Sequence, residues 1–235
     1  MTLSSFEFVS MSTTNLKEVF LMNKNLTELV FILDRSGSMG GLEADTIGGF
    51  NAMLEKQKKE EGEAYVSTIL FDHEVEVLHD RVSIDKIQPI TDRDYFVRGS
   101  TALLDALGGA IHHIANVHKY AREEDRPGKT IFVITTDGCE NASQEYSYRK
   151  VKQMVAKEQE KYGWEFLFLG ANMDAISAAA DFGIRAERAV RFKADGAGVK
   201  LNYATVSAAV SEMRVSGCVR DDWAAEIECD FKKRG

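Results

Sequence analysis

At 235 residues, the chain has the length of one α/β domain and is long enough to bury a sizeable core. Apolar residues make up 44% of it and charged residues 28%, which is typical of a globular protein in water. The formal net charge of -8 argues against binding to nucleic acid or to an anionic membrane surface, because both require a basic surface on the protein.

The targeting features and the cysteines favour a cytoplasmic protein. No apolar stretch approaches the roughly 20 residues of a transmembrane helix. The first 22 residues lack the basic start and the continuous apolar core of a secretory signal, and Glu7, Lys17 and Glu18 interrupt them. The three cysteines are odd in number and lack CxxC spacing, so we expect reduced thiols and neither a disulfide framework nor a zinc site.

The first half of the chain predicts three strands and two helices. A continuous apolar run at residues 29–33 is typical of a strand buried on both faces, and a helix follows it with an apolar stripe of Ile47, Phe50 and Leu54. Residues 65–71 predict a second strand, and the alternating residues 74–78 predict a half-exposed edge strand. Residues 83–98 look irregular, and Thr101 then opens a helix whose apolar face is Leu104, Leu107, Ile111 and Ile114.

The second half repeats the alternation of strand and helix. It predicts strands at residues 129–135, 165–169 and 188–192. The predicted helices are residues 144–161, with Val151, Val155 and Tyr162 inward, then 173–182, and finally a helix with apolar residues Val199, Tyr203, Val206, Val210 and Met213.

This order predicts an α/β fold. We expect a doubly wound, mostly parallel central sheet with one antiparallel edge strand and with helices on both faces, as in Rossmann-like proteins. The patterning is weak at both ends of the chain. We therefore expect an N-terminal extension at residues 1–22, one domain at 23–217 and a C-terminal tail at 218–235.

Three polar segments follow strands or precede helices of the predicted sheet. Asp34, Ser36 and Ser38 come directly after the first strand, Thr101 stands before the second helix, and Asp137 follows the strand at 129–135. The carboxyl ends of parallel strands share one edge of a sheet, so we expect these side chains to converge there. All five offer oxygen, which suits a hard cation such as Mg²⁺ or Mn²⁺ better than zinc.

This arrangement resembles the metal-ion-dependent adhesion site (MIDAS) of von Willebrand factor A domains, in which a DxSxS loop is combined with a distant Thr and a distant Asp. The sequence supplies Asp34, Ser36 and Ser38, then Thr101, then Asp137, in that order. The alternation of strands and helices over residues 28–217 also resembles the family fold, so the likeness covers most of the chain.

The resemblance implies a role for each of these residues. Ser36 and Ser38 would bind the cation through their hydroxyls, Thr101 would join them when a ligand is present, and Asp34 and Asp137 would act mainly through water. A cation held by neutral hydroxyls keeps much of its charge, and a carboxylate from a partner's Asp or Glu would complete its shell. The resemblance extends to partners such as AAA+ ATPases or other large assemblies, and it implies a protein that is not an enzyme.

Two other functions are compatible with parts of the pattern. In a phosphatase of the haloacid dehalogenase type, Asp34 would be the nucleophile, although such enzymes usually have a second Asp where this chain has Ser36. A structural scaffold with an incidental metal is the other alternative. A P-loop nucleotide enzyme is not indicated, because the chain contains no GxxxxGK[ST] motif.

Several residues near the motif are more simply explained without a role in binding. Arg35 is interpreted as a solvated surface arginine, and the alternative is a residue on the rim of the site that attracts acidic partners. Cys139 is interpreted as a small residue with no reactive role. The five histidines are interpreted as surface or packed residues, since His73 and His79 share strand parity but have no evident third ligand.

Overall fold

The computed structural model describes residues 23–171 and 174–234, which build one six-stranded sheet in the order β3-β2-β1-β4-β5-β6. The strands are β1 (Asn23–Asp34), β2 (Glu63–Phe71), β3 (Val75–Ser83), β4 (Pro127–Thr136), β5 (Glu165–Ala171) and β6 (Ala189–Phe192). All neighbouring strands are parallel except β2 and β3. The predicted mostly parallel sheet with one antiparallel edge strand is therefore confirmed.

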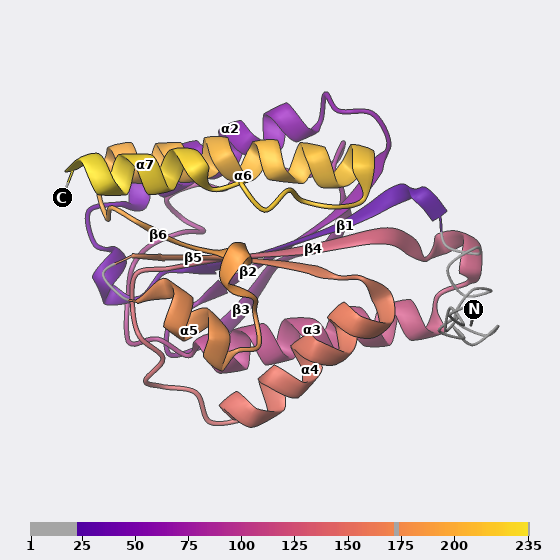
Figure 1. Cartoon of the computed structure of the whole chain (residues 1–235), viewed down its shortest axis with the longest axis horizontal. Coiled ribbons are helices and arrows are strands. Elements are labelled where there is room, and N and C mark those ends of the chain that lie inside the picture. The colour runs from indigo at the N-terminus through magenta and orange to yellow at the C-terminus, as the bar shows by residue number, and fades with distance from the viewer. Residues whose placement is uncertain (1–22, 172–173, 235) are drawn as a thin grey trace, which may run out of the picture.

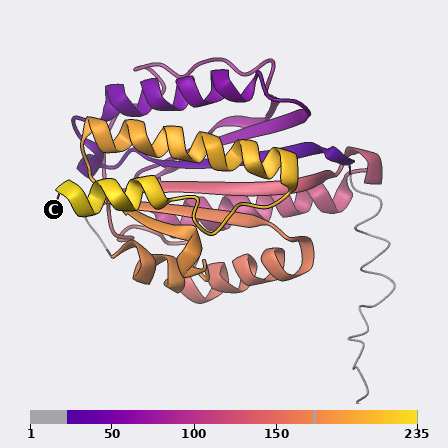
Figure 2. The same ribbon diagram turned by 45° about the horizontal axis from the view of Figure 1, so that its top comes forward.

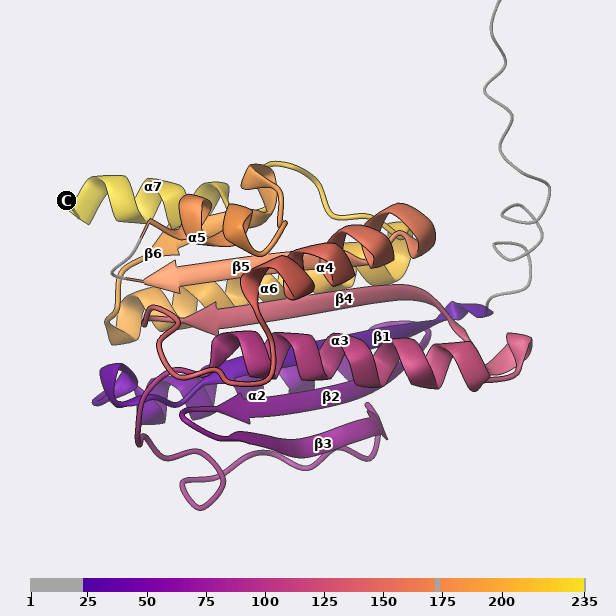
Figure 3. The same ribbon diagram turned by 90° about the horizontal axis from the view of Figure 1, so that it is seen from below.

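Helices cover both faces of this sheet (Figure 1). One layer consists of α2 (Glu43–Gln57), α6 (Gly196–Ser216) and α7 (Ala225–Arg234), which lie side by side in Figure 2. The other consists of α3 (Leu103–Tyr120), α4 (Tyr148–Tyr162) and α5 (Ala175–Asp181), as the view from below shows (Figure 3). Short 3-10 helices occupy residues 37–39, 123–125 and 186–188. Within the described ranges, no helix is long and apolar enough to cross a membrane.

The central strand β1 explains why the sheet needs both helical layers. Successive side chains of a strand point to opposite faces. Phe31 and Leu33 pack in the core under α2 and α6, whereas Val30 and Ile32 pack in the core under α3 and α4. An apolar run without alternation is thus what a strand between two layers requires.

Two helices begin later than the sequence pattern predicts. The helix α3 begins at Leu103, after Thr101, and its N-cap residue is Ala102. The helix α4 begins at Tyr148 instead of residue 144, with Ser147 as a side-chain cap. The intervening backbone amides of residues 144–146 donate to the Asp105 carboxylate of α3, and this tertiary contact holds them out of the helix.

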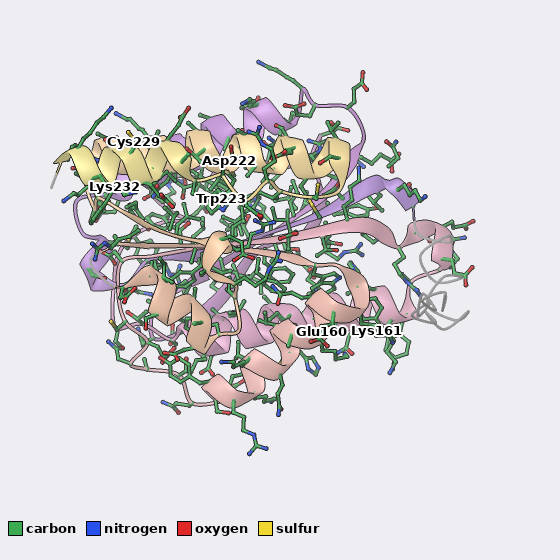
Figure 4. The ribbon with its side chains drawn as sticks, viewed as in Figure 1. Glu160, Lys161, Asp222, Trp223, Cys229 and Lys232 are labelled. Carbon is green, nitrogen blue, oxygen red and sulfur yellow. The ribbon has the colours of Figure 1, made fainter. Side chains whose placement is uncertain are left out.

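The C-terminal region forms an ordered part of the packed unit. Residues 218–235, expected as a tail, contain α7, whose Ile227 is only 1% exposed. Trp223, just before α7, is buried and donates from its indole nitrogen to the Glu187 carbonyl, whereas Cys229 and Lys232 of the helix are exposed (Figure 4). The expected N-terminal extension, residues 1–22, lies outside the described residues.

Candidate metal site

The two central strands bring the predicted site residues to one edge of the sheet. Strand β1 pairs in parallel with β4, and Leu33 lies opposite Thr135. Asp34 and Thr136 are the last residues of these strands, and Asp137 follows directly. The carboxyl edge of the sheet therefore places the two aspartates side by side at a point where parallel strands end, as the sequence predicts.

Both carboxylate oxygens of Asp34 are engaged by protein donors. Oδ1 accepts from the backbone N–H of Ser36 at 2.7 Å, and Oδ2 accepts from the hydroxyl of Thr136 at 2.5 Å. The hydroxyl of Tyr95 donates to the backbone carbonyl of Asp34 at 2.5 Å. Asp34 is therefore a fixed and almost fully buried anchor for the loop that follows β1.

Sequence reasoning missed Thr136 and Tyr95 as supports of this loop. Thr136 stands next to Asp137 in a TTDG run, and this position at a strand end is a signal that could have identified it. Tyr95 lies within residues 83–98, which have no helix or strand pattern, so the sequence gives no comparable signal for it.

The hydroxyls of the first loop lie close to each other and to Asp137. The Oγ atoms of Ser36 and Ser38 are 3.1 Å apart, and Ser38 donates a short hydrogen bond to the Asp137 carboxylate. Two adjacent ligands of an octahedral Mg²⁺, each about 2.0–2.1 Å from the ion, would lie about 2.9 Å apart. The spacing of the two serine hydroxyls thus fits neighbouring positions in such a shell.

Gly138 shows that Thr101 faces the same small space. A Cβ atom built at Gly138 would lie 2.9 Å from Thr101 Oγ1, 3.3 Å from Ser38 Oγ and 3.7 Å from Ser36 Oγ. Three hydroxyls from two separate loops therefore surround a space that a single methyl group would crowd. Asp34, Ser36, Ser38, Thr101 and Asp137 are all brought together, and their donor atoms are those that a hard cation prefers.

Backbone contacts align the loop before Thr101 with the loop after β1. The Gly37 N–H donates to the Gly99 carbonyl at 3.1 Å, and the Arg98 N–H donates to the Arg35 carbonyl at 2.9 Å. Gly99 has a φ of +65°, and a Cβ there would lie 2.1 Å from His73 Nδ1. Only glycine suits this position, where the chain turns toward Thr101.

Burial raises the pKa of both aspartates above the ordinary value. For Asp34 the loss of solvation outweighs the hydrogen bonds from Thr136 and Ser36, which lower the pKa. For Asp137 burial again comes first, the hydrogen bond from Ser38 lowers the pKa, and the negative charge of Asp34 raises it further. Two poorly solvated carboxylates side by side favour a bound cation, because it would compensate their charge.

The interpretation of Arg35 as a solvated surface arginine is wrong. Its side chain is fully buried, with Nε 2.7 Å from Asp72 and Nη1 2.7 Å from Glu76. The partner Asp72 begins the turn after β2 and is buried as well, so the two charges neutralise each other inside the protein. The sequence does not show this, because the two residues are 37 positions apart.

A second cluster beside this ion pair has the residue types of a metal site but is already neutralised. Ligand atoms of Asp72, His73 and Glu74 lie within 4.8 Å of one another. Asp72 Oδ2 accepts from both Arg35 and Arg98, at 2.7 and 2.8 Å. Although burial raises the pKa of Asp72, hydrogen bonds from Arg98, from the Glu74 amide and from Arg35 lower it overall. Guanidinium groups thus already supply the positive charge that a cation would bring.

The remaining histidines and the cysteine near the motif have ordinary surroundings. His118 is a packed histidine, as interpreted, with Nε2 3.1 Å from the buried Glu28 carboxylate. His113 pairs with Asp80 on the surface. Cys139 is exposed and follows Gly138.

Comparisons with known proteins identify the fold. No protein-family model and no curated protein matches the chain. Among solved structures, proximal thread matrix protein 1 from the mussel byssus has 15% identity and a TM-score of 0.53, over 79% of this chain and 46% of its own. A von Willebrand factor type A protein from Catenulispora acidiphila has 12% identity and a TM-score of 0.52, over 79% of this chain and 42% of its own.

Two of the similar structures contain a divalent metal. The mussel protein is also known with zinc in its MIDAS motif, at a TM-score of 0.54 and 15% identity over 79% of this chain and 46% of its own. The manganese-loaded TRAP protein of Plasmodium vivax has a TM-score of 0.50 and 14% identity over 77% of this chain and 73% of its own. The chain spans less than half the length of the mussel protein. Its six-stranded sheet, its antiparallel edge and these likenesses show that it has the fold of von Willebrand factor A domains.

Proposed function

We propose that this chain is a protein-interaction module that binds Mg²⁺ or Mn²⁺ and, through the cation, an Asp or Glu side chain of a partner protein. The observation that carries the proposal is the convergence of three neutral hydroxyls and a carboxylate around Gly138. The metal-loaded structures with the same fold support it, since the mussel protein holds zinc in its MIDAS motif and the TRAP protein is loaded with manganese.

Each residue has a distinct part in the proposed site. Ser36 and Ser38 would hold the cation through their hydroxyl oxygens, and Thr101 would add its hydroxyl when a partner's carboxylate is bound. Both oxygens of Asp34 already accept hydrogen bonds, so Asp34 acts by orienting Ser36 and by its charge. Asp137 orients Ser38, and its remaining carboxylate oxygen would be available to the hydration shell of the cation. The cation itself supplies a Lewis-acidic centre that favours an anionic ligand over water.

The alternative of a phosphatase with Asp34 as the nucleophile has less support. A nucleophilic carboxylate needs a free oxygen that faces the substrate. Asp34 is 1% exposed, and Ser36 and Thr136 occupy its two oxygens. Trapping of an aspartyl-phosphate after incubation with a phosphate ester would nevertheless support the enzyme and contradict the binding module.

Calorimetric titration with Mg²⁺ and Mn²⁺ tests the metal site. We expect one site in the wild-type chain and none in the double variant Asp34→Ala, Ser36→Ala. The variant Glu145→Ala is a matched control, because it removes an exposed acid of the loop after β4 that is not one of the five proposed site residues. Equal binding by the wild type and the double variant would contradict the proposal.

The partner is tested by affinity capture with Mg²⁺ and then with EDTA. We expect proteins that are retained only with the metal and that are lost in Thr101→Ala. An AAA+ ATPase among them would support the partner class that the family resemblance implies. Retention that is equal in EDTA and in Thr101→Ala would mean that the domain binds through another surface.

A further inference from the structure

Thr101 is held by residues of the loop that carries Asp137. Its backbone N–H donates to Asn141 Oδ1 at 2.9 Å, and its carbonyl accepts from the amides of Asn141 and Ala142 at 3.0 and 3.2 Å. The same loop also comes close to the Thr101 hydroxyl at Gly138. Within the described part of the chain, all recorded backbone hydrogen bonds of Thr101 are therefore made with residues 141 and 142.

The loop after β4 is in turn fixed to the start of α3 by two carboxylates. Glu140 accepts from the Leu104 amide at 2.7 Å and from the amides of Ala142 and Ser143 at 3.0 and 2.8 Å. From the other side, Asp105 of α3 accepts from three consecutive amides of the loop. This reciprocal capping makes the loop a firm support for the residues that contact Thr101.

The contact between Asn141 and Thr101 is separate from the capping of the helix. The amide of Leu104, the second residue of α3, donates to Glu140, and the N-cap residue is Ala102. Asn141 is itself exposed and makes no contribution to the core. Its side chain therefore binds the Thr101 backbone and takes no part in capping the helix.

We infer that Asn141 is a positioning residue of the proposed site, which holds the Thr101 hydroxyl beside Asp137 and thereby connects two of the three loops that would surround the cation. The inference rests on the proposed function. A residue that orients a ligand from outside the coordination shell typically changes metal affinity by about 10- to 100-fold when it is removed.

The test is a double-mutant cycle on Mn²⁺ affinity, measured by electron paramagnetic resonance in acetate buffer, with acetate in place of the partner's carboxylate. We expect Asn141→Ala to weaken binding by about tenfold in the wild-type background and by less than about twofold in Thr101→Ala, because its effect passes through Thr101. Asn141→Asp keeps the acceptor oxygen and should bind at least as well as the wild type. Gln144→Ala, an exposed residue of the same loop, is the matched control.

A second measurement reports on Thr101 without any metal. In EDTA, the Thr101 amide should exchange with solvent faster in Asn141→Ala than in the wild type or in Gln144→Ala, because its acceptor is lost. Unchanged Mn²⁺ affinity in Asn141→Ala, or an equal loss in the Thr101→Ala background, would overturn the inference while Ser36→Ala still loses the metal. If Ser36→Ala and Thr101→Ala both bind Mn²⁺ normally, the proposed function fails and the inference fails with it.

Discussion

Gly138→Ala is the smallest change that should close the proposed metal site while the fold persists. The added methyl group would lie 2.9 Å from Thr101 Oγ1 and 3.3 Å from Ser38 Oγ, closer than an ordinary contact between carbon and oxygen. Gly138 does not have a positive φ, so alanine causes no backbone strain there. The expected effect is therefore a steric one on the hydroxyls.

The size of the expected loss in Mg²⁺ affinity follows from the coordination geometry of the cation. Mg²⁺ demands near-octahedral oxygens at about 2.0–2.1 Å, so a displacement of one hydroxyl by several tenths of an ångström removes that ligand. We expect affinity for Mg²⁺ to fall at least about tenfold, which corresponds to about 1.4 kcal/mol. The free energy of unfolding in EDTA should change by less than about 1 kcal/mol.

Calorimetry gives the affinity, and urea denaturation in EDTA gives the stability. Gly109→Ala is the matched control, since a Cβ at this position in α3 meets nothing within 4 Å. It should bind Mg²⁺ like the wild type. If Gly138→Ala also binds like the wild type, the hydroxyls around Gly138 do not hold the cation, and the site is wrongly placed.

Three further predictions concern charge and packing. Burial raises the pKa of Asp137, so its charged form costs stability at neutral pH, and this cost fades as the pH falls toward that pKa. Asp137→Asn should thus match or exceed the wild-type melting temperature in EDTA, most clearly near neutral pH, and gain less from Mg²⁺. Asp72→Asn should lower the free energy of unfolding by about 3–5 kcal/mol, because the buried Arg35 loses its buried counter-charge and keeps only the half-exposed Glu76. Glu76→Gln should cost less than about 1 kcal/mol. Ile227→Ala, measured by the same denaturation, should cost about 2–4 kcal/mol, and no loss would show that α7 does not pack on the sheet.

The sheet could be predicted from the sequence because its strands are buried on both faces. Residues 29–33 and 131–134 are apolar without interruption, a pattern that a strand between two helical layers requires. The convergence of Asp34 and Asp137 follows from the same topology, since parallel neighbours end at one edge. For these parts, local pattern and chain topology lead to the same structure.

Other features depend on contacts between distant residues, which no local pattern shows. The start of α4 is delayed because Asp105, about 40 positions away, binds the amides of the preceding residues. Arg35 is buried against Asp72, which lies in the turn after β2, and Tyr95 reaches Asp34 from an irregular segment. The weak pattern of α7 reflects its single fully buried residue, Ile227.

The ion pairs of Arg35 and Arg98 determine whether these arginines could attract an acidic partner. Arg35 lies within the DxSxS loop, the backbone of Arg98 is hydrogen-bonded to that of Arg35, and both guanidinium groups are bound to Asp72. Exposed Glu74 and Glu76 pair with them as well, so this side of the site has no surplus of positive charge. A chain with a net charge of -8 would repel an acidic partner at long range.

The cation is then the main source of attraction for a carboxylate at this edge. Removal of the metal should therefore abolish binding of the partner instead of merely weakening it, because two uncompensated aspartates, Asp34 and Asp137, would face the incoming acid. The measurement is partner affinity in EDTA and in Mg²⁺ at two salt concentrations. Binding in EDTA that persists and strengthens at low salt would point to attraction by basic residues elsewhere on the surface, and it would refute a mechanism in which the cation reverses the local field.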